Sequence, residues 1–190
     1  MTEIILFHHV QGLTDGVVAF ADRLRSAGHT VHTPDLFESR LFDTIDEGSA
    51  YREEVGFEEL TRRAYAACAD LPDDVVYAGM SMGVAPAQIM LQANAEARGG
   101  LFLFGFIDPS YLDDPWPSGI PAQVHGMADD PYMAEGDWEA AEAIAAQHAN
   151  LEIFRYPGTA HLFADTSSPD HDEAAAAQLL ERAEAFLARL

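Results

Sequence analysis

Short apolar runs alternate with longer amphipathic segments along most of the chain. The short runs are apolar enough to be buried on both faces, and the longer segments have helical periodicity, most clearly at Glu173–Arg189. This alternation predicts an α/β fold, with helices on both faces of a mostly parallel sheet. We expect six strands, at Glu3–His8, Thr30–Thr33, Val75–Ala78, Leu101–Gly105, Ala122–Gly126 and Leu151–Tyr156.

The helical segments fill the gaps between these strands, and the chain shows no internal repeat, so we expect one domain over residues 1–190. Two connections, residues 36–56 and 106–121, are long enough to be lids or binding loops. Arg40 in the first, and Tyr111 and Trp116 in the second, are candidate walls of a substrate pocket. The expected helices are Gly16–Ala27, Phe57–Leu71, Met82–Ala97, Asp137–Ala149 and Glu173–Arg189.

The net charge of the chain limits the kinds of partner that it is expected to bind. Ten arginines and no lysine stand against 32 acidic residues, for a net charge of −22. Such a surface repels phosphate backbones and anionic lipid, so we expect neither nucleic acid nor a membrane as partner. The start of the chain has no basic or apolar leader, and Cys68 has no second cysteine to pair with. These features predict a cytoplasmic protein acting on a small molecule; the sequence does not indicate an oligomeric state.

The strongest chemical signal is the sequence Gly79-Met80-Ser81-Met82-Gly83, between a predicted strand and a predicted helix. A G-x-S-x-G turn in this context holds its serine in strained backbone geometry and points the hydroxyl into a pocket. The flanking glycines let neighbouring elements approach closely enough for the turn to form. Ser81 is therefore the candidate nucleophile.

A serine nucleophile needs a histidine to take its proton and a carboxylate to orient that histidine, in the chain order Ser, acid, His. Asp129 follows the fifth predicted strand and His161 follows the sixth, so all three candidates lie at carboxyl ends of strands. Asp108 and the adjacent Asp130 are alternatives for the acid. His171 is the alternative base, in a segment that resembles an exposed helix start. We predict the triad Ser81, Asp129 and His161.

The oxygen that becomes negative during acyl transfer needs hydrogen-bond donors. The Met82 amide, at the start of a helix, is the predicted first donor. The second is expected in the loop after the first strand, with Val10 as the choice and Gln11 as the alternative. His9 and Gln11 of this loop are also candidate pocket residues. Pro86 conflicts with a regular first turn, because it has no N–H to donate.

His8, His9 and His125 suggest a metal site as another possibility, but their spacing matches no metal signature. Adjacent histidines in a strand point to opposite faces, so at most one of His8 and His9 can face the site. We therefore expect neither a metal nor any other cofactor.

Over nearly its whole length the chain resembles the dienelactone hydrolase family of α/β-hydrolases. The similar segments are Phe7–Gly12, Ala27–His29, Pro34–Leu36, the turn at Ser81, Gly126–Asp129 and Tyr156–Phe163. The resemblance implies a single-domain α/β-hydrolase with Ser81 as nucleophile, Asp129 as acid and His161 as base.

Ser81 stands where the best-known members of that family have a cysteine, and His9 where they have a glutamate. Those members bind an anionic lactone through an arginine near the catalytic histidine, a region where this chain has Asp165. We therefore expect a neutral ester, thioester or lactone as substrate, with Arg40 or Arg52 as the available cations. Two alternatives stay open: a non-catalytic binding or regulatory module on the same fold, and an acyltransferase or cofactor-free perhydrolase.

Overall fold

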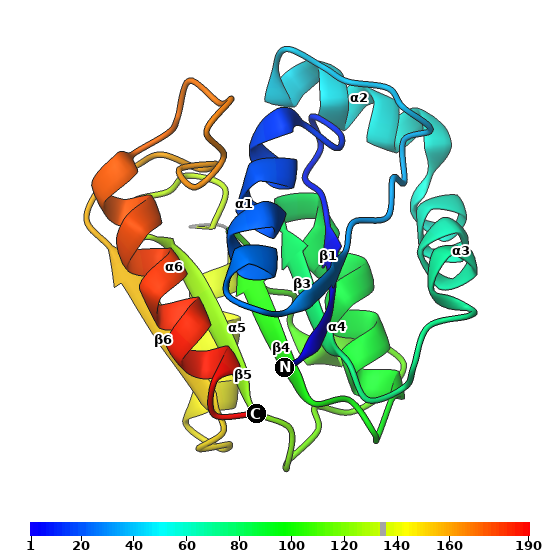
Figure 1. The fold of residues 1–190 in the computed structure, drawn as a ribbon, viewed down its shortest axis with the longest axis vertical. Helices are drawn as coiled ribbons and strands as arrows, with labels where there is room; N and C mark the ends of the chain where they lie inside the picture. Colours follow the sequence, from blue (N-terminus) through cyan, green and yellow to red (C-terminus); the bar gives the residue numbers. More distant parts are fainter. Residues whose placement is uncertain (134–135) are drawn as a thin grey trace.

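The central sheet is parallel throughout. The computed structural model describes residues 1–133 and 136–190, and in these ranges six strands form one sheet in the order β2-β1-β3-β4-β5-β6 (Figure 1). Every neighbouring pair runs parallel. The α/β prediction is confirmed, and each predicted strand lies within two residues of the observed bounds. The strands are β1 (Glu3–Phe7), β2 (Thr30–His32), β3 (Val76–Met80), β4 (Gly99–Leu103), β5 (Ala122–Met127) and β6 (Leu151–Tyr156).

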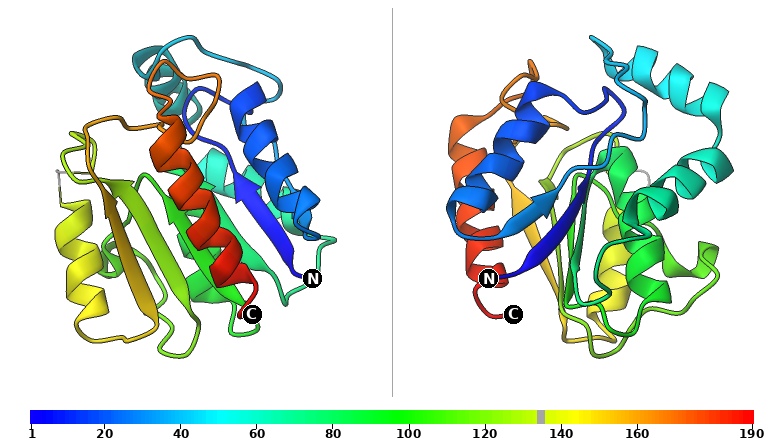
Figure 2. Two further views of the ribbon diagram at one scale, coloured as in Figure 1. Left: turned by 60° about the vertical axis from the view of Figure 1, so that its left-hand side comes forward. Right: turned by 45° about the vertical axis from the view of Figure 1, so that its right-hand side comes forward.

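Helices cover both faces of this sheet, because successive strand residues point to opposite sides. Ile4 and Leu6 of β1 pack in one buried cluster with α1 (Asp15–Ser26) and α6 (Glu173–Leu187). Ile5 and Phe7 pack in another, with α3 (Phe57–Cys68), α4 (Val84–Ala93) and α5 (Asp137–Ala145). The two layers lie on either side of the sheet in Figure 2. Strands buried on both faces explain the continuous apolar runs of the sequence.

The first long connection is not wholly irregular: residues 45–55 form helix α2 (Ile45–Val55), which the hydrophobic pattern did not predict. The Thr44 side chain caps it by accepting from the Glu47 amide. Within α2 the buried residues are Gly48 and Tyr51, too few to leave an apolar stripe in the sequence. The second connection contains a single short turn of 3₁₀ helix at Pro109–Tyr111.

The helix after β3 begins differently from the prediction. Residues Ser81–Gly83 form a 3₁₀ turn, and the α-helix proper starts at Val84. This places Pro86 within the first turn of α4, where an amide has no partner inside the helix. The conflict raised by Pro86 is thus resolved by a later helix start.

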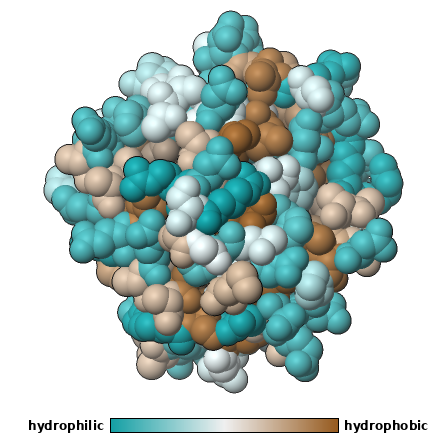
Figure 3. All heavy atoms as spheres, viewed as in Figure 1, coloured by the Kyte–Doolittle hydropathy of each residue, from teal (hydrophilic) through white to brown (hydrophobic). Residues whose placement is uncertain are grey.

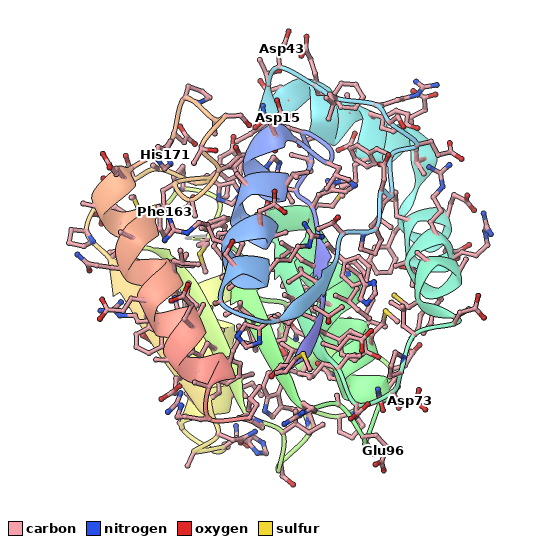
Figure 4. The ribbon with its side chains drawn as sticks, in the orientation of Figure 1. Asp15, Asp43, Asp73, Glu96, Phe163 and His171 are labelled. Atoms are coloured by element: carbon pink, nitrogen blue, oxygen red, sulfur yellow. The ribbon has the colours of Figure 1, made fainter. Side chains whose placement is uncertain are left out.

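The carboxyl ends of the strands lie at the top of Figure 1, together with α2 and the loop between β6 and α6, while both termini lie at the bottom. Exposed acidic residues occur at both ends: Figure 4 shows Asp15 and Asp43 at the top and Asp73 and Glu96 at the bottom. Hydrophilic residues dominate the face shown in Figure 3, with hydrophobic patches between them. Among the described residues, each helix is too short or too polar to cross a bilayer.

Candidate active site

The serine turn has the strained geometry that its sequence predicts. Ser81 has φ +50°, in the left-handed region that costs a non-glycine residue on the order of 1–3 kcal/mol. A Cβ on Gly79 would lie 2.1 Å from the Gly83 carbonyl oxygen, and one on Gly83 would lie 2.3 Å from the Phe7 carbonyl oxygen. Both glycines are therefore required by close backbone contacts, which hold the turn against β1.

Ser81, His161 and Asp130 form a continuous chain of hydrogen bonds. The Ser81 Oγ lies 2.8 Å from His161 Nε2, and His161 Nδ1 lies 2.7 Å from Asp130 Oδ2. Asp130 is fully buried and His161 nearly so, with 4% of its surface exposed. With the ring neutral and its proton on Nδ1, the histidine donates to Asp130 and its Nε2 accepts from the serine hydroxyl. This is the arrangement a general base for Ser81 requires.

The aspartate that contacts His161 is Asp130, one residue after the predicted Asp129. The carboxylate of Asp129 is exposed, while its backbone amide donates to the Gly158 carbonyl. The turn after β5, closed by the Asp130 amide donating to the Met127 carbonyl, directs the second aspartate inward.

The other two alternatives lie elsewhere. Asp108 accepts from the Ser110 amide at 2.8 Å and so caps the turn that follows it. His171 lies beside the start of α6 near Phe163, and its Nδ1 donates to the Phe163 carbonyl at 3.0 Å (Figure 4). Neither residue lines the pocket that contains Ser81.

Two aromatic rings that the sequence analysis missed flank the histidine. The Tyr132 ring centroid is 4.5 Å from that of His161, and Phe104 makes an edge contact at 6.2 Å. The Tyr132 amide also donates to the second oxygen of Asp130 at 2.9 Å, so the same turn holds the Asp130 carboxylate and places the ring. Phe104 falls within the predicted strand Leu101–Gly105, but β4 ends at Leu103, and Tyr132 lies in a turn after β5. The hydrophobic pattern does not indicate that either ring contacts the histidine.

Ser81 opens into a cavity of about 620 Å³, within the size range usual for small-molecule sites. Val10, Met82 and His161 line it beside the serine, so both predicted amide donors belong to residues at the pocket surface. The rest of the wall is mostly apolar and comes from α2, α3, α4 and the segment after β4. Its members include Leu36, Phe57, Leu60, Val84, Pro86, Phe106 and Ile107, with Arg52, Glu53 and Asp137 as charged residues.

None of the five other residues predicted for the pocket lines it. His9 is fully buried, and the Gln11 side chain donates to the carbonyls of Phe42 and Asp43. Arg40 lies over the Tyr51 ring, 4.8 Å from its centroid. Trp116 is packed in the core against Phe102 and Phe106, while Tyr111 is 84% exposed. Loop length alone did not show which way these side chains turn.

Two further expectations about charge change with the structure. Asp165 does not face the pocket; it is fully buried and accepts a hydrogen bond from His9 Nε2 at 2.7 Å, so it cannot repel a bound substrate directly. Of the two arginines considered, Arg52 does line the pocket, 3.8 Å from Glu53.

Cys68 lies outside the pocket that contains Ser81. Burial raises the pKa of its thiol to about 11 and keeps the thiol protonated at neutral pH.

The comparisons with known proteins agree with this architecture. A dienelactone hydrolase-like promiscuous phosphotriesterase from metagenomic libraries has a TM-score of 0.82 at 20% identity, covering 100% of this chain and 87% of its own. A putative dienelactone hydrolase from Klebsiella pneumoniae has a TM-score of 0.73 at 17% identity, covering 100% and 88%. A putative α/β-superfamily hydrolase from Xanthomonas campestris has a TM-score of 0.64 at 19% identity and covers both chains fully.

At these identities the likeness to solved structures establishes the fold alone. No curated protein sequence matches the chain. The dienelactone hydrolase family, however, matches it over residues 1–190, which is the whole sequence. That family and its structural neighbours indicate a hydrolase. The chain belongs to the dienelactone hydrolase family.

Proposed function

We propose that the protein hydrolyses a small carboxylic ester, thioester or lactone through an acyl intermediate on Ser81. The observation that carries this proposal is the hydrogen-bonded chain from Ser81 Oγ to His161 and on to Asp130, which opens into an apolar pocket. A serine hydroxyl is a weak nucleophile at neutral pH and becomes reactive when an oriented base accepts its proton.

In the first half-reaction, His161 Nε2 takes the Ser81 proton as Oγ forms a bond to the substrate carbonyl carbon. The carbonyl oxygen becomes negative, and the amides of Met82 and Val10 are its proposed donors. Asp130 holds the ring in the productive tautomer and stabilises the imidazolium. When the carbon–oxygen or carbon–sulfur bond of the leaving group breaks, His161 returns the proton to that group.

In the second half-reaction, a water molecule takes the place of the leaving group. His161 accepts a proton from this water as its oxygen attacks the acyl carbon, and the same two amides stabilise the second oxyanion. When the second tetrahedral intermediate collapses, the bond between the acyl carbon and Ser81 Oγ breaks. Ser81 Oγ regains its proton from His161, and the carboxylic acid product leaves. The residues present supply every proton transfer, so the mechanism is balanced without a cofactor.

The pocket favours an uncharged, largely apolar substrate. Most of its wall is aliphatic or aromatic, and the charge of Arg52 is partly offset by Glu53, its neighbour in sequence. A structurally similar protein from Pyrobaculum calidifontis, at a TM-score of 0.64, is named an esterase, and this name fits the ester class that we propose here.

The proposal is tested by stopped-flow hydrolysis of p-nitrophenyl acetate and butyrate, followed by a panel of thioesters and lactones. We expect turnover, an acyl adduct on Ser81 by mass spectrometry after acid quench, and loss of both in Ser81→Ala. A folded protein that hydrolyses nothing in the panel and forms no adduct would contradict the proposal and favour the binding-module alternative.

A further inference from the structure

A second histidine–aspartate pair lies beside the site but does not line it. His9 Nε2 and Asp165 Oδ2 are 2.7 Å apart, and both residues are fully buried. Asp165 also accepts hydrogen bonds from the Thr14 hydroxyl and from the amide and hydroxyl of Ser167, at 2.6–2.7 Å. Burial raises the pKa of the Asp165 carboxyl, but these hydrogen bonds together outweigh burial and hold that pKa below its usual range. The carboxylate is thus a fixed, ionised acceptor.

The other nitrogen of the His9 ring is also used. The Gln11 amide donates to His9 Nδ1 at 3.2 Å, so a neutral ring with its proton on Nε2 satisfies both neighbours at once. This bond turns the Gln11 amide towards His9. Of the two residues considered as second oxyanion donor, Gln11 is absent from the lining of the catalytic pocket and Val10 is part of it. The His9 ring therefore engages the Gln11 amide, and the residue of the turn that borders the pocket beside Ser81 is Val10.

The same turn is held by further contacts. The His9 carbonyl accepts from the Gly12 amide at 3.0 Å and from His8 Nδ1 at 2.7 Å. The His9 carbonyl belongs to the peptide that carries the Val10 amide, so these two contacts hold that amide from its carbonyl side. A Cβ added to Gly48 of α2 would lie 2.0 Å from the Val10 carbonyl oxygen, so α2 packs directly on the next peptide, between Val10 and Gln11. Two consecutive peptides held in this way are preorganised, which is what a donor to a developing oxyanion needs.

We propose that His9 and Asp165 are positioning residues that aim the Val10 amide at the oxyanion, an inference that rests on the proposed function. Asp165 follows His161 by four residues, in the loop between β6 and α6. The pair thereby ties the loop that carries the proposed base to the loop that carries the proposed donor. Neither His9 nor Asp165 contacts the substrate; both act through the geometry of Val10.

The direct test is His9→Gln, whose side-chain NH₂ can still donate to Asp165 but which has carbon, and therefore no acceptor, at the position of Nδ1 that the Gln11 amide uses. With p-nitrophenyl butyrate we expect kcat to fall about 10- to 100-fold, somewhat less than removal of a whole oxyanion donor, with KM changed less than about 3-fold. A trifluoromethyl ketone, which forms a tetrahedral oxyanion on the serine, should bind more weakly by the same factor as kcat falls. A purely structural role would not link these two quantities.

The matched control is His125→Gln. His125 is also fully buried and bonded at both ring nitrogens, to Tyr156 and Gln123, but lies outside the pocket. We expect it to lower thermal stability without lowering kcat or ketone affinity. Equal kinetic losses in the two variants, or an unchanged kcat in His9→Gln, would overturn the proposal while leaving the proposed function intact.

A second variant covers the case in which His9→Gln does not fold. Gly48→Ala keeps His9 and Asp165, suits a helix better than glycine, and presses on Val10 from the other side. We expect the same coupled loss of kcat and ketone affinity, and its absence would overturn the proposal. Wild-type protein that is folded yet hydrolyses no ester would instead overturn the proposed function, and this inference with it.

Discussion

Two buried histidine–aspartate pairs meet at the loop between β6 and α6, which contributes His161 to one pair and Asp165 to the other. The pairs differ in the group that the second ring nitrogen of the histidine contacts. In both, a ring nitrogen and a carboxylate oxygen are 2.7 Å apart and the aspartate is fully buried. The free nitrogen of His161 faces the Ser81 hydroxyl, whereas that of His9 accepts from the Gln11 backbone amide. A hydroxyl can give up its proton to a histidine, but a backbone amide cannot at ordinary pH. The His161–Asp130 pair is therefore suited to proton transfer, whereas the His9–Asp165 pair is suited to holding a loop in place.

The two carboxylates are also held differently. Counting donors in residues 1–133 and 136–190, Asp165 receives four hydrogen bonds, from His9, Thr14 and two groups of Ser167. On the same count Asp130 receives two, from His161 and the Tyr132 amide. A more fully bonded carboxylate contributes more to folding, and a less fully bonded one leaves its histidine freer to change protonation state. This difference predicts that the two pairs respond in opposite ways to the same substitution.

The largest expected effect is on catalysis, from Asp130→Asn. Without the carboxylate, His161 loses the partner that selects its tautomer, and we expect kcat to fall about 10⁴-fold, as in other serine triads. Steady-state ester hydrolysis measures this. Asp129→Asn is the matched control, since Asp129 is exposed and should leave kcat unchanged. A larger loss in the Asp129 variant would restore the original sequence-based choice.

The next effect is on stability, from Asp165→Asn. An amide in this position offers one acceptor oxygen to four donors and leaves buried groups without partners, so we expect unfolding free energy to drop by about 3 kcal/mol. Asp130→Asn should lower the unfolding free energy by less than Asp165→Asn does. Urea unfolding of both variants checks the order, and an equal or larger loss for Asp130→Asn would remove the distinction between the two pairs.

A third buried histidine, His125, extends the comparison because it forms an ion pair with none of the carboxylates that the structure describes. His125 contacts Tyr156 and Gln123, and burial, aided by the charge of Arg182, lowers its pKa to about 3. The unfolded chain, with a pKa of about 6.5 for this group, binds the proton more readily. The contribution of His125 to the free energy of unfolding is therefore complete above pH 6.5 and is lost as the pH falls towards 3.

Substitution of this histidine isolates its share of the pH dependence. His125→Gln should reduce the slope of unfolding free energy against pH by about 1.4 kcal/mol per pH unit between pH 6 and 4. Urea unfolding across that range measures the slope. An identical slope in the variant would show that His125 titrates normally in the folded protein.

The smallest expected effect comes from Tyr132, whose ring packs against that of His161 but has no counterpart at His9. An aromatic face stabilises an imidazolium by roughly 0.5–1 kcal/mol at a half-exposed site, so Tyr132→Leu should lower kcat/KM about 3- to 5-fold. Tyr132→Phe keeps the face and should retain wild-type rates. Equal losses in the two variants would point to the hydroxyl instead.

The sheet and the serine turn could both be predicted from the sequence, because both depend on local patterns of residues. Buried parallel strands need continuous apolar runs, and the turn at Ser81 needs glycine at 79 and 83 to avoid clashes with Gly83 and Phe7. Helix α2 left no such pattern, since its buried residues are only Gly48 and Tyr51. The helix was therefore not predicted, although the connection that contains it was expected to contribute to a binding site.

The site was predictable to the level of its loops and not of its side chains. Asp129 and Asp130 are chemically identical neighbours, and which one turns inward depends on how the chain leaves β5. Likewise, His9 and Trp116 were expected in the pocket but are buried elsewhere, by Asp165 and by a cluster of aromatic rings. Side-chain direction in loops is set by tertiary contacts that a single sequence does not contain.

The central claim, that Ser81 is activated by His161, is tested most directly with a fluorophosphonate probe. Peptide mass spectrometry locates the adduct, and labelling rates are compared between wild type, His161→Ala and the surface control His171→Ala. The account predicts an adduct on Ser81 that forms much more slowly in His161→Ala and at the wild-type rate in His171→Ala. Labelling of Ser81 at equal rates in all three, or no labelling of the folded wild-type protein, would contradict it.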